Sequence, residues 1–164
     1  MNKLPLLLLA LSASAQSADI HHFGDTNFAD TKIIVGMASR HFNSDDHKYL
    51  NETNPSIGLE MWDIQAVYIN KNSWNNKSLY LTYAPDYKIN DYLSASIQTG
   101  IATGYTCDSS IKLSKGTYRS DYCTSSGIVP LTALTLDIKP TGKDFALSFS
   151  VTPEVAMFSF SYEL

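Results

Sequence analysis

FALSFSVTPEVAMFSFSYEL, residues 145–164, contains two segments in which apolar residues alternate with small or polar ones. In residues 145–151 the positions between the apolar residues are Ala or Ser, and in residues 158–164 they are Ser159, Ser161 and Glu163. A period of two is the pattern of a β-strand. The second face of a strand in a soluble sandwich is usually rich in Lys and Glu, whereas a small, Ser-rich face suits the packed interior of a barrel whose outside meets lipid. The stretch therefore favours a membrane barrel.

The same alternation recurs along the chain, and helical periodicity is almost absent. The expected strands cover residues 31–42, 56–62, 64–70, 78–83, 92–104, 127–138, 145–151 and 155–164. We predict an all-β fold, an eight-stranded antiparallel up-and-down transmembrane β-barrel over residues 31–164. An even number of strands and closure remove the exposed edges that an open sheet would keep. The competing folds are a soluble sandwich and a lipocalin-like barrel.

The lengths of the connections give this barrel a direction. Residues 43–55, 71–77 and 105–126 follow the first, third and fifth strands, and two of these segments are the longest connections in the chain. The connections around Asp63 and over residues 139–144 are shorter, and residues 84–91 belong to the same shorter set. Outer-membrane barrels have long external loops and short periplasmic turns. Thr152-Pro153, after the seventh strand, is the exception because this external connection is short.

The N-terminal residues have the layout of a secretory signal peptide. A Lys is followed by an apolar run from Leu4 to Leu11, and Ala13-Ser14-Ala15 supplies the small residues of a cleavage site. The run is too short for the ~20 residues of a spanning helix. We expect a cleaved signal peptide over residues 1–15 and a periplasmic N-terminal tail over residues 16–30, and we expect the protein in the outer membrane.

Composition limits the partners. Only 17% of residues are charged, below the roughly 25% of ordinary soluble domains, and ten are Tyr. The net charge is −4 and Lys and Arg form no cluster, which argues against a nucleic-acid partner.

Cys107 and Cys123 are the two cysteines. In an exported chain such a pair is most simply one disulfide, which here closes a loop of ~15 residues and stabilises the fold by about 3 kcal/mol in the chain-entropy estimate. Neither Cys has a Cys or His nearby at ligand spacing, so no metal site is expected.

With the strands placed, the sequence resembles the lipid A palmitoyltransferase family from about Ile33 to Leu164. The matching elements are His41 followed by Tyr49-Leu50-Asn51-Glu52 and Ser56-Ile57-Gly58-Leu59, then Lys71-Asn72-Ser73-Trp74-Asn75, then Gly127-Ile128-Val129-Pro130-Leu131, and last the aromatic final strand. The last strand of outer-membrane proteins usually ends in Phe or Trp, and this chain departs from that with Leu164.

The resemblance implies an outer-membrane barrel with an active site at its outer rim. In the family a His, an Asp and a Ser move a palmitoyl chain from a phospholipid to lipid A. By position these residues are His41, Asn72 and Ser73, and Pro130 marks a gap in the wall that gives lipid access. The expected partners are membrane phospholipid and lipopolysaccharide, with no cofactor and a monomeric barrel.

The direction of the strands places two of these residues at one rim independently of the family resemblance. In an up-and-down barrel the first and third strands run the same way, so His41 and Ser73 are expected at the same rim. Asn72 is the departure, because a carboxylate can stabilise a protonated imidazole while an amide can only orient it through its carbonyl oxygen.

Three functions stay open at this point. The first is an acyltransferase acting on lipid A or a related glycolipid. The second is a non-catalytic outer-membrane barrel, such as a phage-encoded envelope modifier, that kept the fold without the chemistry. The third is a soluble exported lipid-binding barrel.

Overall fold

The computed structural model describes residues 31–43, 49–107, 111–113, 116–118 and 123–164. The predicted signal peptide over residues 1–15 and the tail over residues 16–30 lie outside the described residues. The strands are β1 (Lys32–His41), β2 (Ser56–Met61), β3 (Ile64–Ile69), β4 (Ser78–Tyr83), β5 (Asp86–Asn90), β6 (Leu93–Ala102), β7 (Ile111–Leu113), β8 (Gly116–Tyr118), β9 (Val129–Ile138), β10 (Phe145–Val151) and β11 (Val155–Glu163). Among the described residues, no helix has the length and apolar character needed to cross a membrane.

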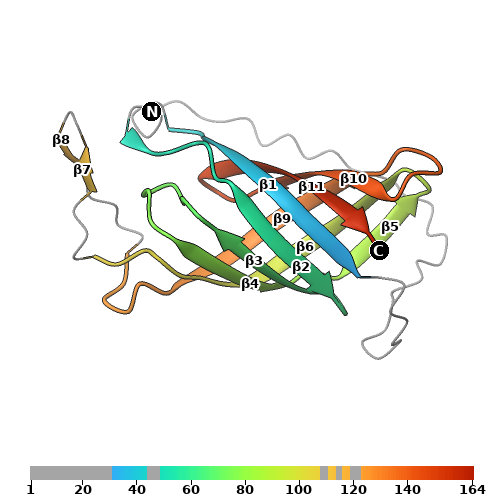
Figure 1. The fold of residues 1–164 in the computed structure, drawn as a ribbon, viewed down its shortest axis with the longest axis horizontal. Helices are drawn as coiled ribbons and strands as arrows, with labels where there is room; N and C mark the ends of the chain where they lie inside the picture. The colour runs from blue at the N-terminus through green and yellow to red at the C-terminus, as the bar shows by residue number, and fades with distance from the viewer. Residues whose placement is uncertain (1–30, 44–48, 108–110, 114–115, 119–122) are drawn as a thin grey trace, which may run out of the picture.

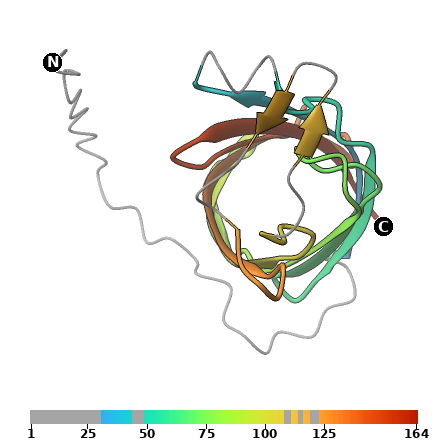
Figure 2. The ribbon, with the colours of Figure 1, turned by 90° about the vertical axis from the view of Figure 1, so that its left-hand side faces the viewer.

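The strands close into an antiparallel barrel (Figures 1 and 2). The hydrogen-bonded order is β4-β3-β2-β1-β11-β10-β9-β6-β5, and β4 also pairs with β6, which joins the two ends of the order. Because β4 and β5 occupy one position, the ring has the eight strands that the sequence predicts. Because the ring is closed, no strand is left as a free edge, as an apolar surrounding requires.

Residues 84–91 were expected as a connection, and this expectation is wrong. β5 continues β4 along β6, because Tyr83 pairs with Thr99 and Asp86 pairs with Ser96 in the same register. Pro85 has no N–H, so it interrupts the ladder without ending the strand. The fourth strand of the barrel is therefore longer than the sequence suggested, and the turn to β6 is short.

The two ends of the barrel differ. One end carries the hairpin turn at Trp62 and Asp63, whose φ angles of 52° and 62° suit a two-residue turn of type I′, together with residues 91–92 and 139–144. We call this end the short-turn rim. The other end carries residues 42–55, 70–77, 103–128 and 152–154, and we call it the long-loop rim. The predicted alternation of long and short connections is confirmed, with 152–154 as the predicted exception.

The long connection between β6 and β9 contains the hairpin of β7 and β8. This hairpin projects from the long-loop rim, away from the wall of the barrel, at the left of Figure 1. This hairpin was not predicted from the sequence.

The outer face of the barrel is apolar. Exposed side chains from the barrel strands include Val35, Ile57, Leu59, Tyr68, Leu79, Leu81, Ile97, Ile101, Leu134, Leu147, Phe149, Phe158 and Phe160. Ten buried side chains of the same strands are polar, namely Ser39, His41, Glu60, Ser78, Thr82, Ser96, Thr135, Ser148, Ser150 and Ser161, and they lie with seven buried apolar ones, of which three are Ala. This is the reverse of a soluble fold and is the arrangement of membrane barrels. The predicted closed eight-stranded antiparallel barrel is confirmed, and its apolar outer face agrees with the pattern from which the membrane barrel was predicted.

Charged side chains fill the interior nearer the short-turn rim. Lys32 Nζ lies 2.7 Å from Glu60 Oε1 and 2.5 Å from Asp86 Oδ2, and Gln65 donates a hydrogen bond of 2.5 Å to Glu60 Oε2. Asp137 lines the same interior cavity, whose volume is about 40 Å³. Such a cavity has room for only a few water molecules. Side chains therefore fill most of the interior around this cavity.

The apolar belt makes a testable prediction. Leu134 lies midway along β9 with 61% of its surface exposed. We expect Leu134→Arg to lower the free energy of unfolding in lipid vesicles by about 2–4 kcal/mol, the cost of a cation at the bilayer midplane. Ile128→Arg, at the long-loop rim, is the control and should cost at most about 1 kcal/mol. Urea unfolding measures both, and equal small costs would contradict contact between the belt and lipid.

Candidate functional site at the long-loop rim

His41 is the last residue of β1 and lies at the long-loop rim, as predicted. It pairs with Val155 of β11, and only 6% of its surface is exposed. The backbone N–H of His41 donates a hydrogen bond of 3.2 Å to Glu52 Oε1, and its ring Nδ1 lies 3.8 Å from the same oxygen. The acidic group beside His41 is therefore a carboxylate from the first long loop.

Three contacts fix Glu52 against the end of β1. Besides its contact with His41, Oε2 accepts a hydrogen bond of 2.8 Å from Arg40 Nη1. The backbone carbonyl of Glu52 accepts one of 2.9 Å from the N–H of Ser39. The sequence placed Glu52 in a matching element but gave it no role, because nothing in the sequence orders the loop around it.

Asn72 is a structural residue of the second long loop. Its Oδ1 accepts hydrogen bonds from the N–H groups of Trp74 at 2.8 Å and Asn76 at 2.9 Å. Its Nδ2 donates to Ser78 Oγ at 2.8 Å and to the Gly104 carbonyl at 3.3 Å. A side-chain amide has two donors and one carbonyl acceptor, so all its groups are engaged. The predicted catalytic role of Asn72 would need an amide group that is already committed to the loop.

Ser73 lies at the same rim as His41, as the strand direction predicts. Its carbonyl oxygen accepts a hydrogen bond of 2.9 Å from the N–H of Asn51. Asn51 precedes Glu52, so two consecutive residues contact Ser73 and His41. This dipeptide brings the ends of the first and third barrel strands together. The catalytic roles of His41 and Ser73 stay predictions.

Buried polar groups support this rim from below. Ser39 Oγ donates a hydrogen bond of 2.7 Å to Asn54 Oδ1, and Asn54 Nδ2 donates to the Lys71 carbonyl at 3.1 Å. The hydroxyls of Tyr80 and Tyr105 lie 2.8 Å apart. Burial raises the pKa of the Tyr105 hydroxyl well above its usual value, and the neighbouring Tyr80 raises it further. Tyr105 is therefore a neutral hydrogen-bonding group.

Pro130 is the second residue of β9 and pairs with Ile101 of β6. On the other side, the described ladder to β10 covers only Leu134–Ile138 of β9. Residues 129–133 thus have a strand neighbour on one side, and the wall is less complete at this level. The lipid-access role of Pro130 stays a prediction.

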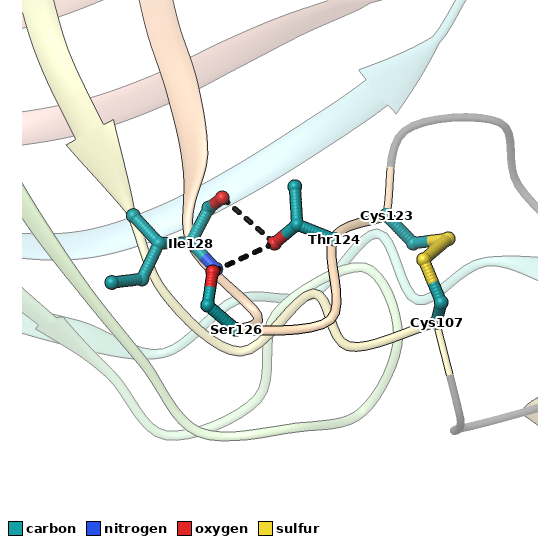
Figure 3. Close-up of a disulfide and its surroundings, with 5 residues drawn as sticks. All are labelled: Cys107, Cys123, Thr124, Ser126 and Ile128. Atoms are coloured by element: carbon teal, nitrogen blue, oxygen red, sulfur yellow. Dashed lines mark hydrogen bonds between the residues drawn. A yellow bond between two sulfur atoms is a disulfide. The ribbon is translucent and has the colours of Figure 1, made fainter.

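The disulfide between Cys107 and Cys123 is confirmed (Figure 3). Its Cα atoms lie 4.8 Å apart, and beside it the N–H of Cys107 donates a hydrogen bond of 3.1 Å to the carbonyl of Thr124. Thr124 Oγ1 donates in turn to the carbonyl of Ile128 at 2.8 Å. These contacts tie the base of the longest connection to the start of β9. Within the described residues, no group of three or more His, Cys, Asp or Glu side chains could hold a metal ion.

Comparisons with known proteins do not assign a family. No family model matches the chain, and no curated protein matches it. A solved structure described as "De novo design of transmembrane beta-barrels" is similar with a TM-score of 0.49 and 10% identity, covering 82% of this chain and 96% of that one. A crystal structure of a protein with unknown function from Clostridium acetobutylicum ATCC 824 has a TM-score of 0.20 and 12% identity, covering 83% and 95%. The fold therefore rests on the strand pairing described above.

The structural role of Asn72 predicts the effect of restoring the carboxylate that the family has there. In Asn72→Asp the side chain no longer donates to Ser78 and faces the Gly104 carbonyl with a negative charge. We expect the free energy of unfolding to fall by about 1–3 kcal/mol, the cost of unsatisfied buried groups. Ser73→Ala, which keeps the backbone contact to Asn51, should change it by less than about 0.5 kcal/mol. Urea unfolding measures both; a more stable Asn72→Asp protein would contradict the loop role.

Proposed function

We propose that this chain is an integral barrel of an outer membrane, with the long-loop rim outside the cell. The observation that carries this proposal is the inversion of its faces, which puts apolar side chains outside and polar ones inside. A soluble exported barrel would expose this apolar belt to water. An exposed apolar surface of that extent is expected where lipid or a partner covers it.

The activity that we propose for the long-loop rim is acyl transfer from a phospholipid to lipid A or a related glycolipid, the chemistry that the resemblance implies. It is supported by the contacts of His41 with Glu52 and of Ser73 with the adjacent Asn51. In the proposed step an acceptor hydroxyl attacks the ester carbonyl of the phospholipid, and His41 takes its proton. The same proton then goes to the alkoxide of the departing lysophospholipid. In this proposal the hydroxyl of Ser73 is the partner of His41 at the rim.

In this proposal the donor lipid stays outside the barrel. An acyl chain extends through one leaflet of the bilayer core, which is about 15 Å thick, half of the ~30 Å total. The interior cavity of about 40 Å³ beside Lys32 and Glu60 is too small for a chain of that length. The donor chain would stay beside the wall, where residues 129–133 around Pro130 have one strand neighbour. Its ester would then reach the rim from the lipid side.

A second candidate is a non-catalytic barrel that modifies the envelope by its presence. Two observations favour it. The position that matches the family's Asp is occupied by Asn72, whose groups hold the loop, and the interior cavity beside Lys32 and Glu60 is smaller than an acyl chain.

Membrane insertion is tested by fractionation. The expressed protein should appear in the outer-membrane fraction, need detergent for extraction, and migrate differently on a gel before and after heating. Release into the periplasm as a protein that needs no detergent would contradict the membrane proposal. It would favour the soluble lipid-binding barrel instead.

Acyl transfer is tested in a strain that lacks its own lipid A palmitoyltransferase. With the folded barrel present, mass spectrometry of lipid A should show one added acyl chain, and His41→Ala and Ser73→Ala should remove it. Heat-modifiable migration of each variant controls for folding. Folded wild-type protein without any added chain would support the non-catalytic barrel, and transfer retained in both variants would remove this site.

A further inference from the structure

The acidic residue of the rim lies on the first long loop, not on the second. We propose that Glu52 is the residue that positions and charges His41, the role that the resemblance places at Asn72. This inference deepens the proposed acyl transfer and rests on it for its catalytic part. The His41–Glu52 pair itself can be tested without any activity.

The geometry divides the two carboxylate oxygens between two neighbours. Oε1 contacts His41 through both the backbone N–H at 3.2 Å and ring Nδ1 at 3.8 Å. Oε2 contacts Arg40 Nη1 at 2.8 Å. With one oxygen held by Arg40, the other is fixed toward the imidazole. A distance of 3.8 Å is an ion-pair distance, and apo catalytic hydrogen bonds are often long before substrate binds.

The competing candidate cannot take this role. Asn72 donates toward Ser78 and Gly104 and accepts from the loop backbone, so its side chain is directed into its own loop. Glu52 instead carries the charge that an amide lacks. A carboxylate beside Nδ1 stabilises the imidazolium formed during proton transfer and assigns proton exchange with the substrate to Nε2.

The surroundings strengthen the pair. His41 is buried, and its side chain and that of Glu52 are 7% and 23% exposed. Interactions between charges are stronger where water is excluded. Arg40 is 63% exposed, so its charge is largely screened by solvent. Glu154 lies at the same strand end, and its backbone carbonyl accepts a hydrogen bond from the N–H of Phe42. Glu52 places a carboxylate oxygen 3.8 Å from the ring of His41.

The first experiment follows the titration of His41 by NMR in detergent micelles, with labelled His. The chain has four His residues, and His41→Ala identifies the signal. Glu52→Gln should lower the midpoint of the His41 titration by about 1 pH unit, because an opposite charge within ~4–6 Å favours the protonated form of the imidazole. Glu52→Asp should lower it by less. Arg40→Gln removes a cation from the same cluster and should not lower it.

The second experiment measures acyl transfer in the strain described above. Glu52→Gln should reduce the rate by about 10–100-fold and shift its pH profile, while Glu52→Asp should recover most of the rate. Heat-modifiable migration verifies that both variants fold.

The outcomes separate the two proposals. An unchanged His41 titration in folded Glu52→Gln protein would overturn the pair whatever the activity. A shifted titration in a protein that transfers no acyl chain would overturn acyl transfer and leave the pair in place. Full transfer by Glu52→Gln, together with loss of transfer by His41→Ala, would remove the positioning role while keeping the proposed function.

Discussion

Closure of the sheet is the constraint on which the rest of this molecule depends. A strand with an apolar outer face has no water on that side to satisfy its backbone, so it needs a strand neighbour on both edges. The pairing of β1 with β11 and of β4 with β6 supplies the neighbours that a linear sheet would lack. Closure in turn directs the remaining polar side chains inward, where they must satisfy one another. The contacts of Lys32 with Glu60 and Asp86 meet this need.

Most of the fold could be predicted because side-chain alternation is a local property. Each barrel strand alternates, and the composition of its second face already indicates a barrel with an apolar outside rather than a sandwich. The fourth strand is longer than the predicted residues 78–83, because the chain resumes its pairing with β6 after Pro85. The structure shows why it continues: the N–H of neighbouring Ala84 bonds to the Asp63 carbonyl, and Asp86 resumes the register on β6. Such support comes from residues distant in sequence, which a local pattern does not contain.

Only the part of the site that depends on strand direction could be predicted. Direction puts His41 and Ser73 on one rim, but it does not determine how a long loop folds between them. Residues 49–55 are held by contacts to other segments, including Asn54 to Ser39 and Asn51 to Ser73. These contacts place Glu52 beside His41. Resemblance by position favoured Asn72, yet the direction of that side chain is set by hydrogen bonds inside its own turn.

Paired charges also limit what the interior near the short-turn rim can do. Buried ionic groups are costly unless they are paired, and here they are paired by side chains from β1, β2 and β5. Moving a solute past this level of the barrel would require breaking these pairs. The long-loop rim, at the opposite end, holds a buried imidazole next to a carboxylate. The part of β9 whose wall is less complete starts from the same rim, three strand positions away from β1 in the ring. Both features that the proposed chemistry uses therefore lie at the end of the barrel away from these ion pairs.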